Sequence, residues 1–149
     1  VAGHQEKNRR GGTENVAGVV GFGLACELAL RELSRAGSHA LALRKKIEAG
    51  VLRVRGARLN GHDSPRLPNT AHFSFDGLDG HHLVVALDLA GICVSSGAAC
   101  ASGSLTPSHV LTAMGLSSEQ AQASLRFSLG RTSTEDEVSR VVEALVSSL

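Results

Sequence analysis

A stretch of small side chains in the second half of the chain carries the residue best suited to nucleophilic chemistry, Cys100. Residues 95–104 read SSGAACASGS and contain only Ser, Gly, Ala and Cys. Such a segment can bury little apolar surface, so we expect a mobile loop. A cysteine acts as a nucleophile when its thiol is ionised and reachable, and this loop provides access and reach. The alternative is an incidental surface cysteine in a linker.

Arg126 is a second candidate, because its side chain is suited to binding a carboxylate. It lies between Leu125 and Phe127 in an alternating segment, which predicts a strand that points the arginine away from the core. A guanidinium presents paired N–H groups that match the two oxygens of a carboxylate. The alternative is an ordinary surface ion pair.

A third candidate is the segment RRGGT at residues 9–13, which precedes a predicted long helix. The start of a helix attracts anions through its free N–H groups and its dipole, and the Thr13 hydroxyl adds a donor. The pattern is consistent with a phosphate site that includes Thr13. The alternative is that Thr13 or Asn15 only caps the helix. We expect no metal site, because the histidines show no metal-ligand spacing with cysteine.

The composition argues against several classes of protein. The formal net charge is only +1, no apolar run could span a bilayer, and the start lacks a signal peptide's apolar region, so we expect neither nucleic acid nor membrane as a partner. The three cysteines form no C-x-x-C pair, which favours free thiols in a reducing compartment such as the cytoplasm. We expect Cys26 and Cys93 to be small core residues. The chain lacks an initiator methionine, so we expect it to be cut from a longer protein.

Four predicted helices should position these residues. Apolar spacing predicts a long helix from Val16 to about Ile47, with a bend near Gly37 and a stop at Gly50. Shorter helices are expected at 83–90 and at 108–114, the second with Thr106 as N-cap and Pro107 in its first position. The last helix follows a capping box formed by Thr134 and Glu137.

Strands alternate with these helices. Alternation of period two predicts strands at 52–55, 70–75 and 125–129, and a short one at 92–94, with a loop at 59–69. The expected fold class is therefore α+β. It consists of a long linking helix followed by a mostly antiparallel sheet with packed helices.

Four segments together resemble the NifS/IscS-type cysteine desulfurases of the class-V aminotransferase superfamily. They are GHQEKNRRGGTENVAG (3–18), RLPNTAHFSFDGLDG (66–80), VSSGAACASGSLTPSHVLTAMGL (94–116) and SLRFSLGRTSTEDEV (124–138). They follow the family's order, and the VSSG-x-AC-x-SGS pattern is highly specific. The resemblance implies a C-terminal fragment of a fold that binds pyridoxal 5'-phosphate (PLP). Residues 1–50 would end the large PLP domain and form the linking helix, and residues 51–149 would form the small domain with catalytic loop 95–104.

The resemblance also implies a role for each candidate residue. Cys100 matches the catalytic cysteine, which takes sulfur from L-cysteine as a persulfide and leaves L-alanine. Arg126 matches the arginine that holds the substrate carboxylate. Thr13 matches a residue that reaches the PLP phosphate of the neighbouring subunit in a homodimer. The implied protein partner is an iron–sulfur scaffold or another sulfur acceptor.

The chain departs from the family in its lysines. The family's Schiff-base lysine lies in a Ser/His-Lys motif upstream of the GTEN segment, but this chain has only Lys7, Lys45 and Lys46, none in such a motif. We therefore expect the isolated chain neither to bind PLP covalently nor to turn over cysteine. Three alternatives stay open: a selenocysteine lyase, another aminotransferase or lyase in which Cys100 is idle, and a non-enzymatic module that carries sulfur or binds a scaffold.

Overall fold

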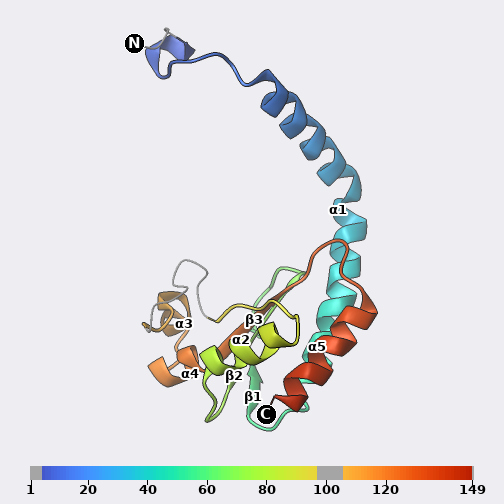
Figure 1. Cartoon of the computed structure of the whole chain (residues 1–149), viewed down its shortest axis with the longest axis vertical. Coiled ribbons are helices and arrows are strands. Elements are labelled where there is room, and N and C mark those ends of the chain that lie inside the picture. The colour runs from blue at the N-terminus through green and yellow to red at the C-terminus, as the bar shows by residue number, and fades with distance from the viewer. Residues whose placement is uncertain (1–4, 97–105, 149) are drawn as a thin grey trace. The chain divides into compact units, whose positions relative to one another are not determined.

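The computed structural model describes residues 5–96 and 106–148, and it divides the chain into two compact units. The units are Val1–Arg35 and Ala36–Leu149, and their boundary falls inside the long helix α1 (Val16–Val51). Figure 1 shows the elements of each unit. Among the helices in the described ranges, none combines the length and the apolar character needed to cross a bilayer.

The first unit contains a short 3-10 helix, η1 (Glu6–Asn8), and the start of α1. Asn15 caps α1, because its Oδ1 atom accepts a hydrogen bond of 3.0 Å from the backbone N–H of Gly18. A Cβ atom at position 18 would lie only 2.5 Å from the Asn15 amide nitrogen, so a larger residue there would displace the Asn15 side chain. Of the two predicted capping residues, Asn15 therefore makes the cap.

The second unit is built on a three-stranded antiparallel sheet in the order β1-β2-β3. Its strands are β1 (Ala57–Leu59), β2 (Thr70–Phe75) and β3 (Ser124–Ser128). The last two strands and the antiparallel α+β fold confirm the prediction. The strand predicted at 52–55 is wrong, because α1 continues to the fully buried Val51 and the chain then turns.

Four further helices follow in the described part of the second unit: α2 (Gly80–Leu89), α3 (His109–Ala113), α4 (Ser118–Gln122) and α5 (Glu135–Ser147). The capping box of Thr134 and Glu137 is confirmed, with the Glu137 carboxylate accepting from the Thr134 N–H at 2.8 Å. The prediction for α3 is wrong at its start, because Ser108 and not Thr106 is the N-cap. The sequence reading missed α4, which is a single short turn behind its own capping box.

The core lies on one face of the sheet, where α1, α2 and α5 supply apolar side chains. Figure 1 shows α5 alongside the C-terminal part of α1. This approach depends on Gly50, where a Cβ atom would lie 2.6 Å from a methyl group of Val142. Gly50 is thus a packing position in the last turn of α1, which ends one residue beyond the predicted stop. The core side chains are Leu43, Ile47, Val51, Ala71, Phe73, Phe75, Leu83, Leu87, Leu125, Phe127, Val138 and Leu145.

Candidate functional site

The opposite face of the sheet carries polar side chains, and three of them form a row that we call the polar row: His72, Arg126 and Ser95. Arg126 lies opposite His72 in the β2–β3 register, between the buried Leu125 and Phe127. On its other side Arg126 forms a bridge with Ser95, through N–H to O distances of 2.7 and 3.2 Å. Directly opposed residues of antiparallel strands share a face, so the three side chains are neighbours.

Arg126 is the only cation of this row at neutral pH, and it has a weak protein partner. Its Nη2 atom lies 3.5 Å from the Ser95 hydroxyl, and its side chain is half-buried. Within residues 5–96 and 106–148, no carboxylate forms an ion pair with it. A half-buried guanidinium without a counter-charge can bind an external carboxylate through two hydrogen bonds. The predicted alternative, a surface ion pair, is absent from the described residues.

His72 is uncharged at neutral pH. Burial, and then the nearby charge of Arg126, lowers the pKa of His72 from 6.5 to about 4. Asn60, which follows β1, places its amide nitrogen 2.8 Å from His72 Nδ1 and donates to the Ser74 hydroxyl at 2.8 Å. The polar row therefore presents one positive charge and one neutral, hydrogen-bonded imidazole.

Cys100 falls outside the described residues, so its predicted role as nucleophile stays a prediction. The first described range ends at Ser96, four residues before Cys100 in the sequence. The residue before Ser96 is Ser95, which is paired with Arg126. The other two cysteines correct a prediction. Cys26 and Cys93 are both exposed and are not core residues, because apolar spacing alone does not show which side of an element its neighbours cover.

Thr13 lies in the first unit, two residues before the helix cap. It is exposed, and its backbone oxygen accepts from Arg10 Nη2 at 3.2 Å. Arg10 itself pairs with Glu14 at 2.5 Å, so its charge is largely satisfied. Gly12, at φ +93°, leaves open space beside Thr13. An exposed hydroxyl in an open stretch fits one contact to a phosphate group, and the remaining contacts to a cofactor would have to come from elsewhere.

No described side chain supplies a lysine beside the polar row. Lys46, on α1, pairs with Glu135 at the start of α5. The described residues also contain no group of three His, Cys, Asp or Glu side chains that could hold a metal ion. The chemistry of the row is therefore limited to hydrogen bonding and charge.

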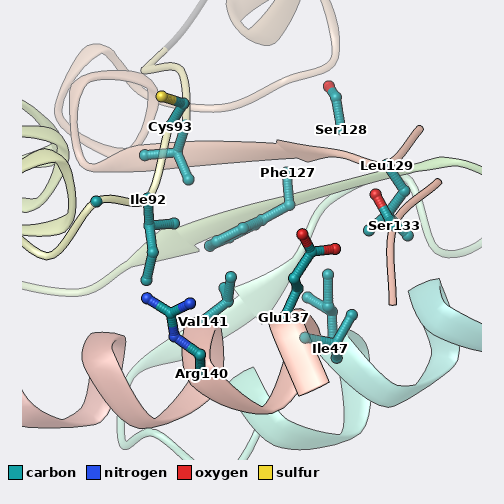
Figure 2. A pocket seen from close by; sticks show the side chains of 13 residues that line it. Ile47, Ile92, Cys93, Phe127, Ser128, Leu129, Ser133, Glu137, Arg140 and Val141 are labelled. Carbon is teal, nitrogen blue, oxygen red and sulfur yellow. The ribbon is translucent and has the colours of Figure 1, made fainter. Parts of the chain in front are cut away.

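A cavity of about 260 Å³ lies on the core side of the sheet, and it contains none of the predicted site residues. In Figure 2, Ile92, Phe127 and Val141 face this space, whereas the Cys93 sulfur and the Ser128 hydroxyl lie on the other side of β3. Glu137 also lines the cavity, but it already belongs to the capping box of α5. The sheet thus separates this cavity from Arg126.

Sequence reasoning singled out Arg126 as a candidate but did not single out its neighbours His72 and Asn60. The alternation in TAHFSF places His72 on the outer face of its strand, and this pattern could have indicated that His72 lies on the polar face. The register that sets His72 opposite Arg126 joins segments far apart in the chain. Asn60 lies in the predicted loop, where its side chain had no assignable partner.

Comparison with known proteins adds independent information. A family model described as aminotransferase class-V matches residues 2–141. Cysteine desulfurase NifS of Azotobacter vinelandii is 46% identical over 141 residues, which cover 94% of this chain and 35% of that protein. Cysteine desulfurase IscS of Methanosarcina thermophila is 46% identical over 143 residues, which cover 96% and 35%.

Solved structures show the same fold. An X-ray structure of a NifS-like protein from Rickettsia africae superposes with a TM-score of 0.85 at 33% identity, covering 99% of this chain and 38% of that one. The chain therefore spans about a third of the length of the relatives that it matches.

Proposed function

This chain belongs to the aminotransferase class-V family, as its resemblance to NifS/IscS-type proteins predicted, and we propose that it is the C-terminal part of a cysteine desulfurase. In this proposal Arg126 binds the carboxylate of L-cysteine, and Cys100 is the thiol that receives the sulfur. Residues 1–50 end the large PLP domain and form the linking helix, and residues 51–149 form the small domain.

The observation that carries the proposal is the pairing of Ser95 with Arg126. It joins Arg126, the carboxylate-binding candidate, to the segment that precedes Cys100 in the chain. Cys100 follows Ser96 by four residues, and four residues extend at most about 14 Å, which limits how far the thiol can travel from Arg126. In this proposal, the residue that binds the substrate carboxylate and the residue that supplies the nucleophile are both held close to the Ser95–Arg126 pair.

The reaction transfers one sulfur atom. The Cys100 thiolate attacks the sulfur of L-cysteine, the carbon–sulfur bond breaks, and the carbon is protonated to give L-alanine. Cys100 keeps the sulfur as a persulfide, so one thiol and L-cysteine become one persulfide and L-alanine. When bound, PLP supplies an electron sink for the carbon skeleton of the substrate. Arg126 holds the carboxylate so that the sulfur stays within reach of the thiolate.

Two roles depend on parts beyond the second unit. We assign Thr13 to the PLP phosphate across a homodimer, which is supported by its exposed hydroxyl next to the open Gly12. We also propose that Cys100 passes its persulfide sulfur to an acceptor such as an iron–sulfur scaffold, and that this transfer takes place in the cytoplasm. Without a lysine at the polar row, we expect the 149-residue chain alone neither to bind PLP covalently nor to turn over cysteine.

A mass measurement tests the proposal in the longer natural protein that carries this segment. After incubation with PLP and L-cysteine, the peptide with Cys100 should gain one sulfur when it is analysed without reductant. Cys100→Ala should retain PLP but release no sulfide, and Cys93→Ala is the matched control, because that exposed thiol should not be required. Undiminished sulfide release from Cys100→Ala would overturn the assignment.

A second arm tests Arg126. Arg126→Lys keeps the charge but loses the paired geometry, so kcat/KM for L-cysteine should fall about 10- to 100-fold, the loss expected for a hydrogen bond to a charged group. Arg58→Lys is the matched control, because Arg58 lies on the same sheet but already pairs with Asp76 at 2.6 Å. Equal effects of both substitutions would contradict a carboxylate site at Arg126.

A further inference from the structure

Asn60 holds the imidazole of His72 in a single orientation. The Asn60 backbone N–H donates to the His72 carbonyl at 2.8 Å, and its amide nitrogen contacts both His72 Nδ1 and the Ser74 hydroxyl at 2.8 Å. Ser74 is buried, so moving the amide would leave a buried hydroxyl without this partner, which is costly. One of these hydrogen bonds therefore reaches the ring itself, and the other two fix Asn60 in the position from which it donates.

These hydrogen bonds also define the tautomer of His72. An amide nitrogen only donates, so Nδ1 accepts and the ring hydrogen is on Nε2. The strand β2 is central in the sheet. Asn60, the residue that follows β1, lies on one side of His72, and Arg126 on β3 lies on the other side. Because Nδ1 faces Asn60, the Nε2–H edge of the ring faces away from Asn60, on the side of Arg126.

A neutral imidazole suits this position next to Arg126. With its pKa lowered to about 4 by burial and by Arg126, the ring adds a donor near pH 7 without adding a second charge. Within the described residues, no acceptor takes the Nε2 hydrogen. Directly opposed side chains have Cβ atoms about 4.5–5.5 Å apart, so one carboxylate can accept from both His72 and Arg126.

We propose that His72 donates a hydrogen bond from Nε2 to the same substrate carboxylate that Arg126 binds, and that Asn60 is the positioning residue that sets the His72 tautomer. The inference rests on the proposed carboxylate role of Arg126. It adds a specificity element, because two adjacent donors favour an α-carboxylate over a neutral amide at that place in the ligand.

Binding to the PLP-loaded natural protein tests the role of His72. His72→Phe keeps the ring size without the donor, and it should weaken L-alanine binding and raise KM for L-cysteine about tenfold, with kcat changed less than about twofold. Binding of L-alaninamide, which lacks the carboxylate, should change little. His72→Gln restores an N–H donor, and it should return L-alanine affinity to within about threefold of the natural protein.

The outcomes separate this inference from the proposed function. If Arg126→Lys weakens L-alanine binding and His72→Phe does not, the inference is wrong while the role of Arg126 stands. If Arg126→Lys leaves L-alanine binding unchanged, the carboxylate site itself is wrong. Equal weakening of L-alanine and L-alaninamide by His72→Phe would show a merely structural role and overturn the inference.

The role of Asn60 has a spectroscopic test in the 149-residue chain. With ¹⁵N-labelled histidine, the His72 ring nitrogens should show the Nε2–H tautomer alone at pH 7. Asn60→Ala should give a mixture of both tautomers, with the sheet retained. A predominant Nδ1–H tautomer in the unmodified chain, or an unchanged His72 signal in Asn60→Ala, would overturn the assignment.

Discussion

The two faces of the β2–β3 pair use the same backbone for different purposes. One face buries Phe73, Leu125 and Phe127 against helices, and the other presents His72 and Arg126 side by side. A register shift of one residue would move every side chain of a strand to the opposite face. The apolar face therefore fixes the register on which the polar pair depends. Because the two faces differ in this way, substitutions on the apolar face should test stability, and substitutions on the polar face should test chemistry.

The largest effect is expected on the apolar face, from Phe73→Ala. Phe73 is fully buried and packs edge-on against Phe127, with ring centroids 5.9 Å apart. Its loss should lower the free energy of unfolding by about 3–5 kcal/mol, measured by urea denaturation. Thr70→Ala, on the other face of the same strand, is the control and should cost less than about 1 kcal/mol. Similar losses from both changes would refute the division between the faces.

The next effect comes from the polar face and depends on pH. The pKa of His72 is about 4 in the folded chain, lowered by burial and by Arg126, and 6.5 is its ordinary value. Between these values the unfolded chain binds more protons, so the free energy of unfolding falls as the pH falls from 6.5 to 4. The loss approaches about 3 kcal/mol, at about 1.4 kcal/mol for each pH unit.

His72→Gln should remove this part of the pH dependence. The carboxyls of Asp79 and Glu135 have lowered pKa values, caused chiefly by the His81 backbone N–H and by the Lys46 ammonium. Both carboxyls remain in the variant, so the difference between the two denaturation series isolates His72. Parallel pH profiles for the two proteins would mean that His72 titrates normally when folded.

A smaller effect tests the helices that support the apolar face. Gly50→Ala puts a methyl group 2.6 Å from Val142, and this overpacking should destabilise the chain by about 1–3 kcal/mol. The double variant with Val142→Ala should recover part of that loss, which a double-mutant cycle measures. Strictly additive losses would show that α1 and α5 do not meet at Gly50.

The smallest effect concerns the cap of α5, the helix that carries Val138 and Leu145 into the core. Thr134→Ala removes a hydroxyl that accepts from the Glu137 N–H at 3.3 Å, and it should cost about 1 kcal/mol in thermal or urea unfolding. Thr134→Ser is the control, because it keeps the accepting oxygen. A loss as large as that from Phe73→Ala would mean that the cap does more than end the helix.

The sequence predicted those elements whose signal is local. Alternation identified β2 and β3, and the Thr134–Glu137 pair identified the start of α5, because each pattern lies within a few residues. The supposed strand at 52–55 also alternates, but Val51 is drawn into the core as the last turn of α1. Local pattern cannot decide between two such outcomes when packing of distant segments selects one.

The candidate site was predictable only in part for the same reason. Arg126 stood out by its type and its place between Leu125 and Phe127. Its pairing with His72, and the anchoring of that ring by Asn60, follow from strand register, which one sequence does not encode in any short window. The exposure of Cys93 likewise depends on what covers the 92–95 segment, not on its apolar neighbours.

The order of the strands has a consequence for how the molecule is made. During synthesis β2 can pair with β1 as soon as the short 60–69 loop has emerged, but β3 follows only after α2, α3 and α4. Until β3 pairs with it, β2, which contains Phe73 and Phe75, has an unpaired edge. Such an edge can pair with a strand of another chain. Non-local pairings also form slowly. Arg126 therefore reaches His72 late in folding, and a nascent chain stalled before Ser124 should be a preferred substrate for chaperones.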